Sequence, residues 1–162
     1  KLTGLLWIDP ALALLMAALL AFTGIPLVRK AIDGLMDAAD DGLLQKLLAA
    51  FELSRRPGLI RVHYVRAMRN GRHVHVDGHA VVPEFWSVEE GHDFVEEYEQ
   101  RALAETGLDG EMEFHVDPCR RAYCRACDLG ECPIRQELFE SRPPLTLAEL
   151  TSAVDITDRP KP

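Results

Sequence analysis

The sequence predicts an α+β protein in which one N-terminal transmembrane helix precedes a small domain of helix–strand–strand–helix–strand order (αββαβ). Three observations support this fold class. An uncharged run rich in Leu and Ala occupies residues 10–28. Two segments of alternating apolar and polar residues flank the hairpin signal Asn70-Gly71. A helix with a capping box and a short third strand follow, ahead of a tail that holds all four cysteines.

Composition narrows the classes of protein to which the chain can belong. It has 162 residues, of which 18 are basic and 26 acidic, for a formal net charge of −8. This length suits one domain with a short appendage, and 48% hydrophobic residues suffice for a packed core. The acidic balance argues against a nucleic-acid-binding protein, and four cysteines are too few for a secreted disulfide scaffold. A start at Lys1, directly before an apolar run, suggests a segment of a longer protein.

The uncharged run has the length and the flanks of a membrane helix. Its 19 residues would span about 28 Å as a helix, close to the hydrocarbon thickness of a bilayer. Trp7 precedes it at an interfacial position, and Arg29 and Lys30 follow it. The positive-inside rule therefore places the C-terminal side in the cytoplasm. A signal peptide or a buried core helix is the alternative, but a signal peptide has a shorter apolar run and a small-residue cleavage site.

The remaining elements follow from periodicity and turn signals. Residues 31–53 have helical spacing interrupted at residues 38–42, where Asp40 or Asp41 can cap the second part. Residues 59–69 and 72–82 are predicted strands, the first with Ile60, Val62 and Tyr64 at alternate positions. Ser87 and Glu90 form a capping box for a helix that ends at Gly107, and residues 111–116 form a third strand.

All six histidines lie between the prolines at positions 57 and 118: His63, His73, His75, His79, His92 and His115. His63 and His79 lie across the hairpin from each other, and His115 shares a strand face with Asp117. Imidazoles and a carboxylate are ligands that Zn²⁺ and Fe²⁺ accept. The alternative is a solvent-exposed polar sheet face, which is the more common role for residues such as His73 and His75.

The cysteines form a second candidate metal site. Cys119, Cys124, Cys127 and Cys132 have the spacing C-x4-C-x2-C-x4-C, and the central C-x2-C is typical of metal ligands. Four thiolates suit a structural Zn²⁺ ion, whereas a transient metal site, an iron–sulfur cluster and unligated thiols remain alternatives. A reducing cytoplasm disfavours disulfides between them.

These residues, taken in order, resemble the C-terminal third of the cation diffusion facilitators, a family of proton-coupled divalent-metal exporters. The resemblance covers residues 3–119. It is carried by WIDP at the start of the apolar helix, KAIDGLMD after it, His63 in RVHYVR, His79 in VDGHAVV, His92 in EEGHDF, and the closing FHVDPC. The sequence is most similar to the iron and zinc efflux branch. The resemblance implies a metallochaperone-like (ferredoxin-like) cytoplasmic domain and a homodimer that closes when metal binds.

The resemblance also implies roles for individual residues. His63, His79 and Asp117 would hold one ion, and His92, His115 and Asp117 a second, with Asp117 as a bridge. Asp37 falls where the family places an acidic residue near the membrane at the dimer interface. The family's transport site lies on its second and fifth membrane helices, neither of which this sequence contains, so no transport-site residue is assigned.

The expected protein is the C-terminal portion of a zinc or iron efflux transporter of a membrane, such as the bacterial inner membrane. Residues 1–37 would be its last transmembrane helix and connector, residues 38–118 its metal-binding dimerisation domain, and residues 119–162 a Cys-rich tail. Its partners would be divalent cations, lipid and a second copy, with no nucleic acid.

The alternative function is a membrane-anchored regulatory or metallochaperone-like module whose four-cysteine site is the main one. Five further apolar segments upstream of Lys1 would favour the transporter. An enzyme is disfavoured because no catalytic motif accompanies the histidines.

Overall fold

The computed structural model describes residues 7–35 and 41–153. The chain divides into two compact units, residues 1–38 and residues 39–162, and each is described by itself. Asp37, the acidic residue implied at a dimer interface, lies outside the described residues.

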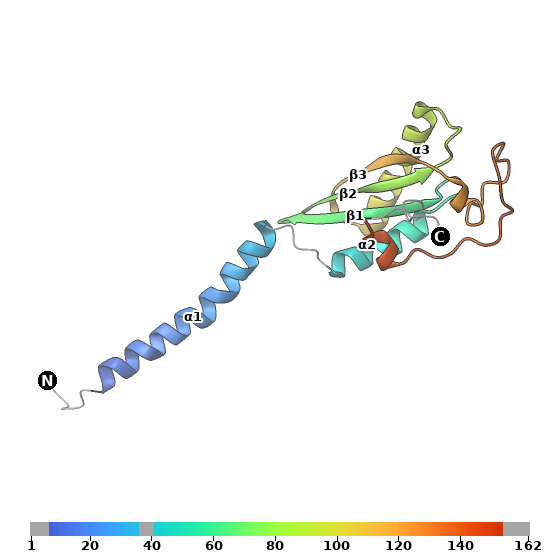
Figure 1. Cartoon of the computed structure of the whole chain (residues 1–162). Helices are drawn as coiled ribbons and strands as arrows, with labels where there is room; N and C mark the ends of the chain where they lie inside the picture. Colours follow the sequence, from blue (N-terminus) through green and yellow to red (C-terminus); the bar gives the residue numbers. More distant parts are fainter. Residues whose placement is uncertain (1–6, 36–40, 154–162) are drawn as a thin grey trace. The chain divides into compact units, whose positions relative to one another are not determined.

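The first unit is the helix α1 (Ile8–Leu35), drawn in blue in Figure 1. Its segment Ile8–Arg29 has a mean hydropathy of 2.4 and is long and apolar enough to cross a membrane. The described side chains of this segment are almost all exposed, large apolar ones such as Leu14 and Phe22 included. The predicted helix is therefore present, and it continues past the apolar run.

The second unit confirms the predicted α+β order. It contains α2 (Asp41–Ser54), β1 (Arg61–Asn70), β2 (His73–Val82), α3 (Val88–Thr106) and β3 (Asp109–Pro118). The sheet order is β1–β2–β3, in which β1 and β2 are antiparallel and β2 and β3 are parallel. The parallel pair requires a crossover, which α3 supplies. Helices α2 and α3 lie together on one face of the sheet (Figure 1) and leave the other face open.

The core lies between this sheet and the two helices. Alternate residues of β2, namely Val74, Val76 and Ala80, have no exposed surface, as the predicted alternation requires. Phe51 of α2 is also fully buried, with its ring centroid 6.0 Å from that of Tyr98 and 5.5 Å from that of Phe114. This aromatic contact joins α2, α3 and β3, so it fixes the helices on the inner face.

Local sequence signals account for the ends of α3. The Ser87 hydroxyl accepts a hydrogen bond from the Glu90 backbone N–H at 3.1 Å, and the Glu90 carboxylate accepts one from the Ser87 backbone N–H at 2.7 Å. Gly107 ends the helix at φ 60°, a left-handed conformation that favours glycine. The predicted capping box and helix end are both confirmed.

The predicted alternation in the first strand is wrong at Tyr64. A β-bulge lies between His63 and Arg66, and Tyr64 adopts φ 52°. The Tyr64 backbone N–H donates to the Ser152 carbonyl at 3.1 Å instead of to a neighbouring strand. After the bulge Val65 faces the core, while His63 and Arg66 remain on the open face opposite His79 and Asp77. Without the bulge, His63 and Val65 would share a face because they are two residues apart. The bulge therefore lets Val65 face the core while His63 stays on the open face.

The described part of the tail, residues 119–153, packs against the helices and the sheet of the second unit. Its short helix α4 (Leu147–Leu150) contacts β1 and α2, and Leu150 is fully buried. The Glu52 carboxylate of α2 accepts a hydrogen bond from the Leu145 backbone N–H at 2.9 Å. The 3₁₀ helix η1 (Arg121–Tyr123) places Tyr123 against the end of the sheet.

The aromatic contact at Phe51 predicts a stability effect. Phe51→Ala would leave a cavity between α2, Tyr98 and Phe114, and should lower the free energy of unfolding of residues 39–162 by about 3–5 kcal/mol. Urea unfolding followed by circular dichroism measures this change. Leu53→Ala is the matched control, because Leu53 lies on the same helix with 70% of its surface exposed. Equal losses for the two variants would contradict the proposed core.

Candidate metal centre

Strand register assembles a polar surface on the open face of the sheet. His63 of β1 pairs with His79 of β2, and His79 pairs with His115 of β3. Next to this row, Arg66, Asp77 and Glu113 occupy successive strands in the same way. Because residues two apart in a strand share a face, His115 and Asp117 lie on the same side. Three histidines and a carboxylate from three strands therefore meet at one end of the sheet.

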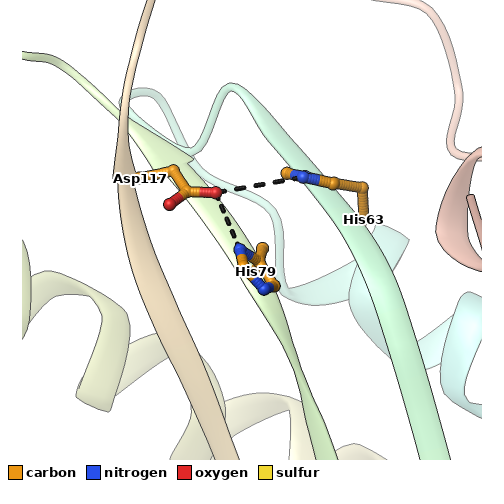
Figure 2. Close-up of side chains that lie close together, drawn as sticks. All are labelled: His63, His79 and Asp117. Atoms are coloured by element: carbon orange, nitrogen blue, oxygen red, sulfur yellow. Dashed lines mark hydrogen bonds and ion pairs between the residues drawn. The ribbon is translucent and has the colours of Figure 1, made fainter. Parts of the chain in front are cut away.

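Asp117 lies at the centre of this group (Figure 2). Its Oδ2 is 2.9 Å from Nδ1 of His79 and 3.9 Å from Nε2 of His63. The imidazole centroids of His63 and His79 are 5.2 Å apart. One ligand atom from each of His63, His79 and Asp117 lies within 4.8 Å of the others. Figure 2 shows both rings directed toward the same carboxylate oxygen.

The donor set of this trio suits a divalent ion. Two imidazoles and a carboxylate are ligands of Zn²⁺ and related metals, and three protein ligands leave one coordination position open. His63 is 4% exposed, whereas His79 and Asp117 are partly exposed. The trio is therefore ordered by the surrounding strands on one side and accessible from the other.

The second oxygen of Asp117 faces a different histidine. Oδ1 lies 3.7 Å from Nε2 of His115, whose ring centroid is 5.1 Å from that of His79. His92, near the start of α3, lines the same groove as His115. His92 belongs to a separate exposed group, in which its ligand atom is within 4.8 Å of those of Asp93 and Glu96. The structure thus brings His115 to Asp117, while His92 is grouped with carboxylates of its own helix.

The sequence interpretation did not include Asp93 and Glu96. His92 and Glu96 are four residues apart on a helix, so their side chains share a face. This i, i+4 spacing is visible in the sequence and could have identified the group.

His73 and His75 lie further along β2, away from Asp117. Nδ1 of His75 is 2.9 Å from Oε1 of Glu111, and Nε2 of His73 is 4.0 Å from the same oxygen. Both histidines therefore face carboxylates of β3 on the polar surface.

The four cysteines surround one cavity at the end of the sheet. Cys119, Cys124, Cys127 and Cys132 all line it, and all four are free thiols. Burial raises the pKa of the Cys119 and Cys127 thiols above the ordinary range of cysteine. Both sulfur atoms therefore stay protonated at neutral pH unless a cation binds.

Comparisons with known proteins assign part of the chain to a family. Residues 46–119 match the family described as the cytoplasmic domain of cation efflux proteins. An uncharacterized transporter of Synechocystis sp. is 32% identical over 117 residues, which cover 72% of this chain and 37% of that protein. The chain therefore spans well under half the length of this relative.

Two solved structures are also similar to the chain. The zinc form of CzrB is 28% identical, over 48% of this chain and 85% of that chain, with a TM-score of 0.43. The metal-bound C-terminal domain of the CzcD transporter from Thermotoga maritima is 22% identical, over 48% of this chain and 90% of that chain, with a TM-score of 0.43.

The position of Asp117 predicts its effect on metal affinity. Asp117→Ala should weaken Zn²⁺ binding to residues 39–162 more than about 100-fold. Even the loss of a residue that only supports a metal ligand, without touching the ion, lowers metal affinity by about 10–100-fold. Isothermal titration calorimetry measures the affinity. Glu113→Ala is the matched control, since it removes a carboxylate from the same strand and face. Wild-type affinity in Asp117→Ala would show that the ion is held elsewhere.

Proposed function

Residues 46–119 of this chain belong to the family of cation efflux cytoplasmic domains, and from this premise we propose that the chain is the C-terminal portion of a proton-coupled exporter of divalent metal ions. In this proposal residues 1–37 supply the last transmembrane helix and residues 38–118 a cytoplasmic domain that binds metal. Metal binding there closes a homodimer. The observation that carries the proposal is the Asp117 carboxylate, which has imidazoles of three strands arranged around its two oxygens.

The two oxygens of Asp117 suit a bridge between two ions. Oδ2 faces His63 and His79, whereas Oδ1 faces His115. An ion held by His63 and His79 would share Asp117 with a second ion held by His115. His92 lines the same groove as His115 and would be the further ligand of that second ion. Zn²⁺ fits this imidazole-rich set, and Fe²⁺ accepts the same ligands. Because the imidazoles must be neutral to bind a metal ion, protons compete with the metal ion for them.

A second copy of the domain is the partner that the open face favours. His63, His79 and Asp117 leave a coordination position that a residue of another copy can fill. Exposed acidic side chains also line this face, including Glu111 and Glu113, whereas Asp77 is paired with Arg66 at 2.7 Å. Two such faces repel each other until divalent ions offset their charge. Ions that bind the closed arrangement better than the open one therefore shift the population toward closure.

The membrane part of the proposal rests on α1 and on the Synechocystis relative. The segment Ile8–Arg29 is long enough to cross a bilayer, and basic residues follow its apolar run. The positive-inside rule then places the metal-binding domain in the cytoplasm. The relative is described as a transporter, and this chain covers 37% of it. An exporter of this kind would respond to cytoplasmic metal through the domain next to its last helix.

Metal-dependent closure predicts a change of shape in solution. Adding Zn²⁺ to residues 39–162 should reduce the radius of gyration of the dimer, measured by small-angle X-ray scattering at constant protein concentration. Asp117→Ala should abolish the reduction, because both proposed ions use its carboxylate. Glu105→Ala, which removes an exposed carboxylate near the end of α3, serves as the control and should compact like the wild type. A full response in Asp117→Ala, or none in the wild type, would contradict the proposal.

A further inference from the structure

Tyr64 adopts a backbone conformation that favours glycine. Tyr64 and Val65 together lie opposite Gly78 in the bulge between β1 and β2. Tyr64 has φ 52°, the one positive φ of a residue other than glycine in the described part of the chain. In the bulge type whose first residue is left-handed, that residue is usually glycine, because a side chain there is strained. A bulky residue persists at such a position only where its surroundings hold it, so the contacts of Tyr64 are informative.

The Tyr64 ring lies against His79 of the candidate metal centre. Their ring centroids are 5.5 Å apart, at an interplanar angle of 58°. The rings of His63 and His115 lie 5.2 and 5.1 Å from that of His79. Nδ1 of His79 is 2.9 Å from Oδ2 of Asp117. Three of these four neighbours are candidate ligands, whereas Tyr64 contacts His79 through its ring and so restricts how the imidazole can turn.

Arg66 also contacts the Tyr64 ring. Its guanidinium carbon lies 5.1 Å from the ring centroid, within the range of a cation–π contact. The same guanidinium donates to Oδ2 of Asp77, from Nε at 3.0 Å and from Nη2 at 2.7 Å. Because two hydrogen bonds to one carboxylate fix the guanidinium, Arg66 supports the Tyr64 ring from a defined position on the open face.

The tail holds the backbone of Tyr64. The Tyr64 N–H donates to the Ser152 carbonyl at 3.1 Å, and Ser152 lies two residues beyond the end of α4. The Ser152 N–H in turn donates to the Glu149 carbonyl at 3.2 Å. Leu150 of the same helix is fully buried in the core. The burial of Leu150 therefore places a hydrogen-bond acceptor beside the bulge, where it supports the conformation that brings the Tyr64 ring to His79.

We propose that Tyr64 is a positioning residue of the metal centre, which holds the His79 imidazole beside Asp117 and is itself held by the tail through Ser152. This inference rests on the proposed metal site around Asp117, in which Tyr64 acts through His79 and not as a ligand. A ligand whose orientation is fixed before the ion arrives loses less conformational freedom on binding. Residues that orient a metal ligand typically change metal affinity by about 10–100-fold when they are removed.

The Zn²⁺ affinity of the full chain in detergent, measured by competition with a fluorescent chelator, tests this role. Tyr64→Gly removes the ring and suits a left-handed backbone, so it should weaken Zn²⁺ binding about 10-fold although it relieves the strain. Tyr64→Phe keeps the ring and should bind Zn²⁺ as the wild type does. Met68→Ala is the matched control and should also bind normally, because Met68 lies on the same strand opposite His75, away from Asp117.

Nuclear magnetic resonance of the metal-free chain, with ¹³C-labelled histidine rings, gives a readout that needs no bound ion. The His79 ring signals should move in Tyr64→Gly, because the neighbouring aromatic ring is lost, and should stay in place in Tyr64→Phe and Met68→Ala. The signals of His73, at the other end of β2, should not move in any of these variants. Leu150→Ala weakens the docking of α4, so it should move the His79 signals in the wild type but not further in Tyr64→Gly.

The opposite results would overturn the proposal. Wild-type affinity and unmoved His79 signals in Tyr64→Gly would remove the positioning role, and unmoved signals in Leu150→Ala would remove the role of the tail. Equal weakening in Tyr64→Phe and Tyr64→Gly would assign the effect to the hydroxyl group, as for a ligand. Wild-type affinity in Asp117→Ala would overturn the metal site as well, whereas its loss there with normal binding in Tyr64→Gly would overturn the positioning role alone. Far-ultraviolet circular dichroism checks the fold, and Tyr64→Ala replaces Tyr64→Gly if the glycine variant does not fold.

Discussion

The register of three strands is the constraint on which the open face depends. His63, His79 and His115 lie side by side because β1 pairs with β2 in one register and β2 with β3 in another. A shift of one residue in either register would turn every side chain of a strand to the opposite face. The buried valines of β2 prevent this shift, because Val74, Val76 and Ala80 must remain in the core. Apolar packing on one face therefore fixes imidazole geometry on the other.

Most of the second unit could be predicted from local signals. The capping box at Ser87 and the alternation along β2 are each determined by a few neighbouring residues. The hairpin turn is also local, and it lies at Gly71-Arg72, one residue beyond the predicted Asn70-Gly71. The bulge at Tyr64 could not be predicted in this way, because the Tyr64 backbone N–H bonds Ser152, which is distant in sequence. The burial of Leu150 against α2 and β1 likewise depends on a tertiary contact made by the tail.

The sequence was enough to identify most residues of the candidate sites, but not to predict how they are arranged in space. Strand parity was enough to expect His115 and Asp117 on one face. His63 was expected across the hairpin from His79, but this pairing depends on the bulge, because the register at the turn, where Asn70 pairs with His73, would bring His63 opposite Ala80. The position of His92 depends on how α3 crosses the sheet, and its neighbours Asp93 and Glu96 became evident only on the helix surface. The cysteine spacing predicted a metal site, but the gathering of the four cysteines around one cavity depends on how Arg135 and Tyr123 fold the loop. Because Val81 pairs with Asp117 and also packs beneath this loop, the two sites share one end of the sheet.

The central claim is that Asp117 shares its carboxylate between metal ions held by histidines of the open face. Crystals of residues 39–162 grown with Zn²⁺ and measured on both sides of the zinc absorption edge test it most directly. The account predicts anomalous density between His63, His79 and Asp117, and further density on the His115 side of the same carboxylate. Zinc found only at sites remote from Asp117 would contradict it.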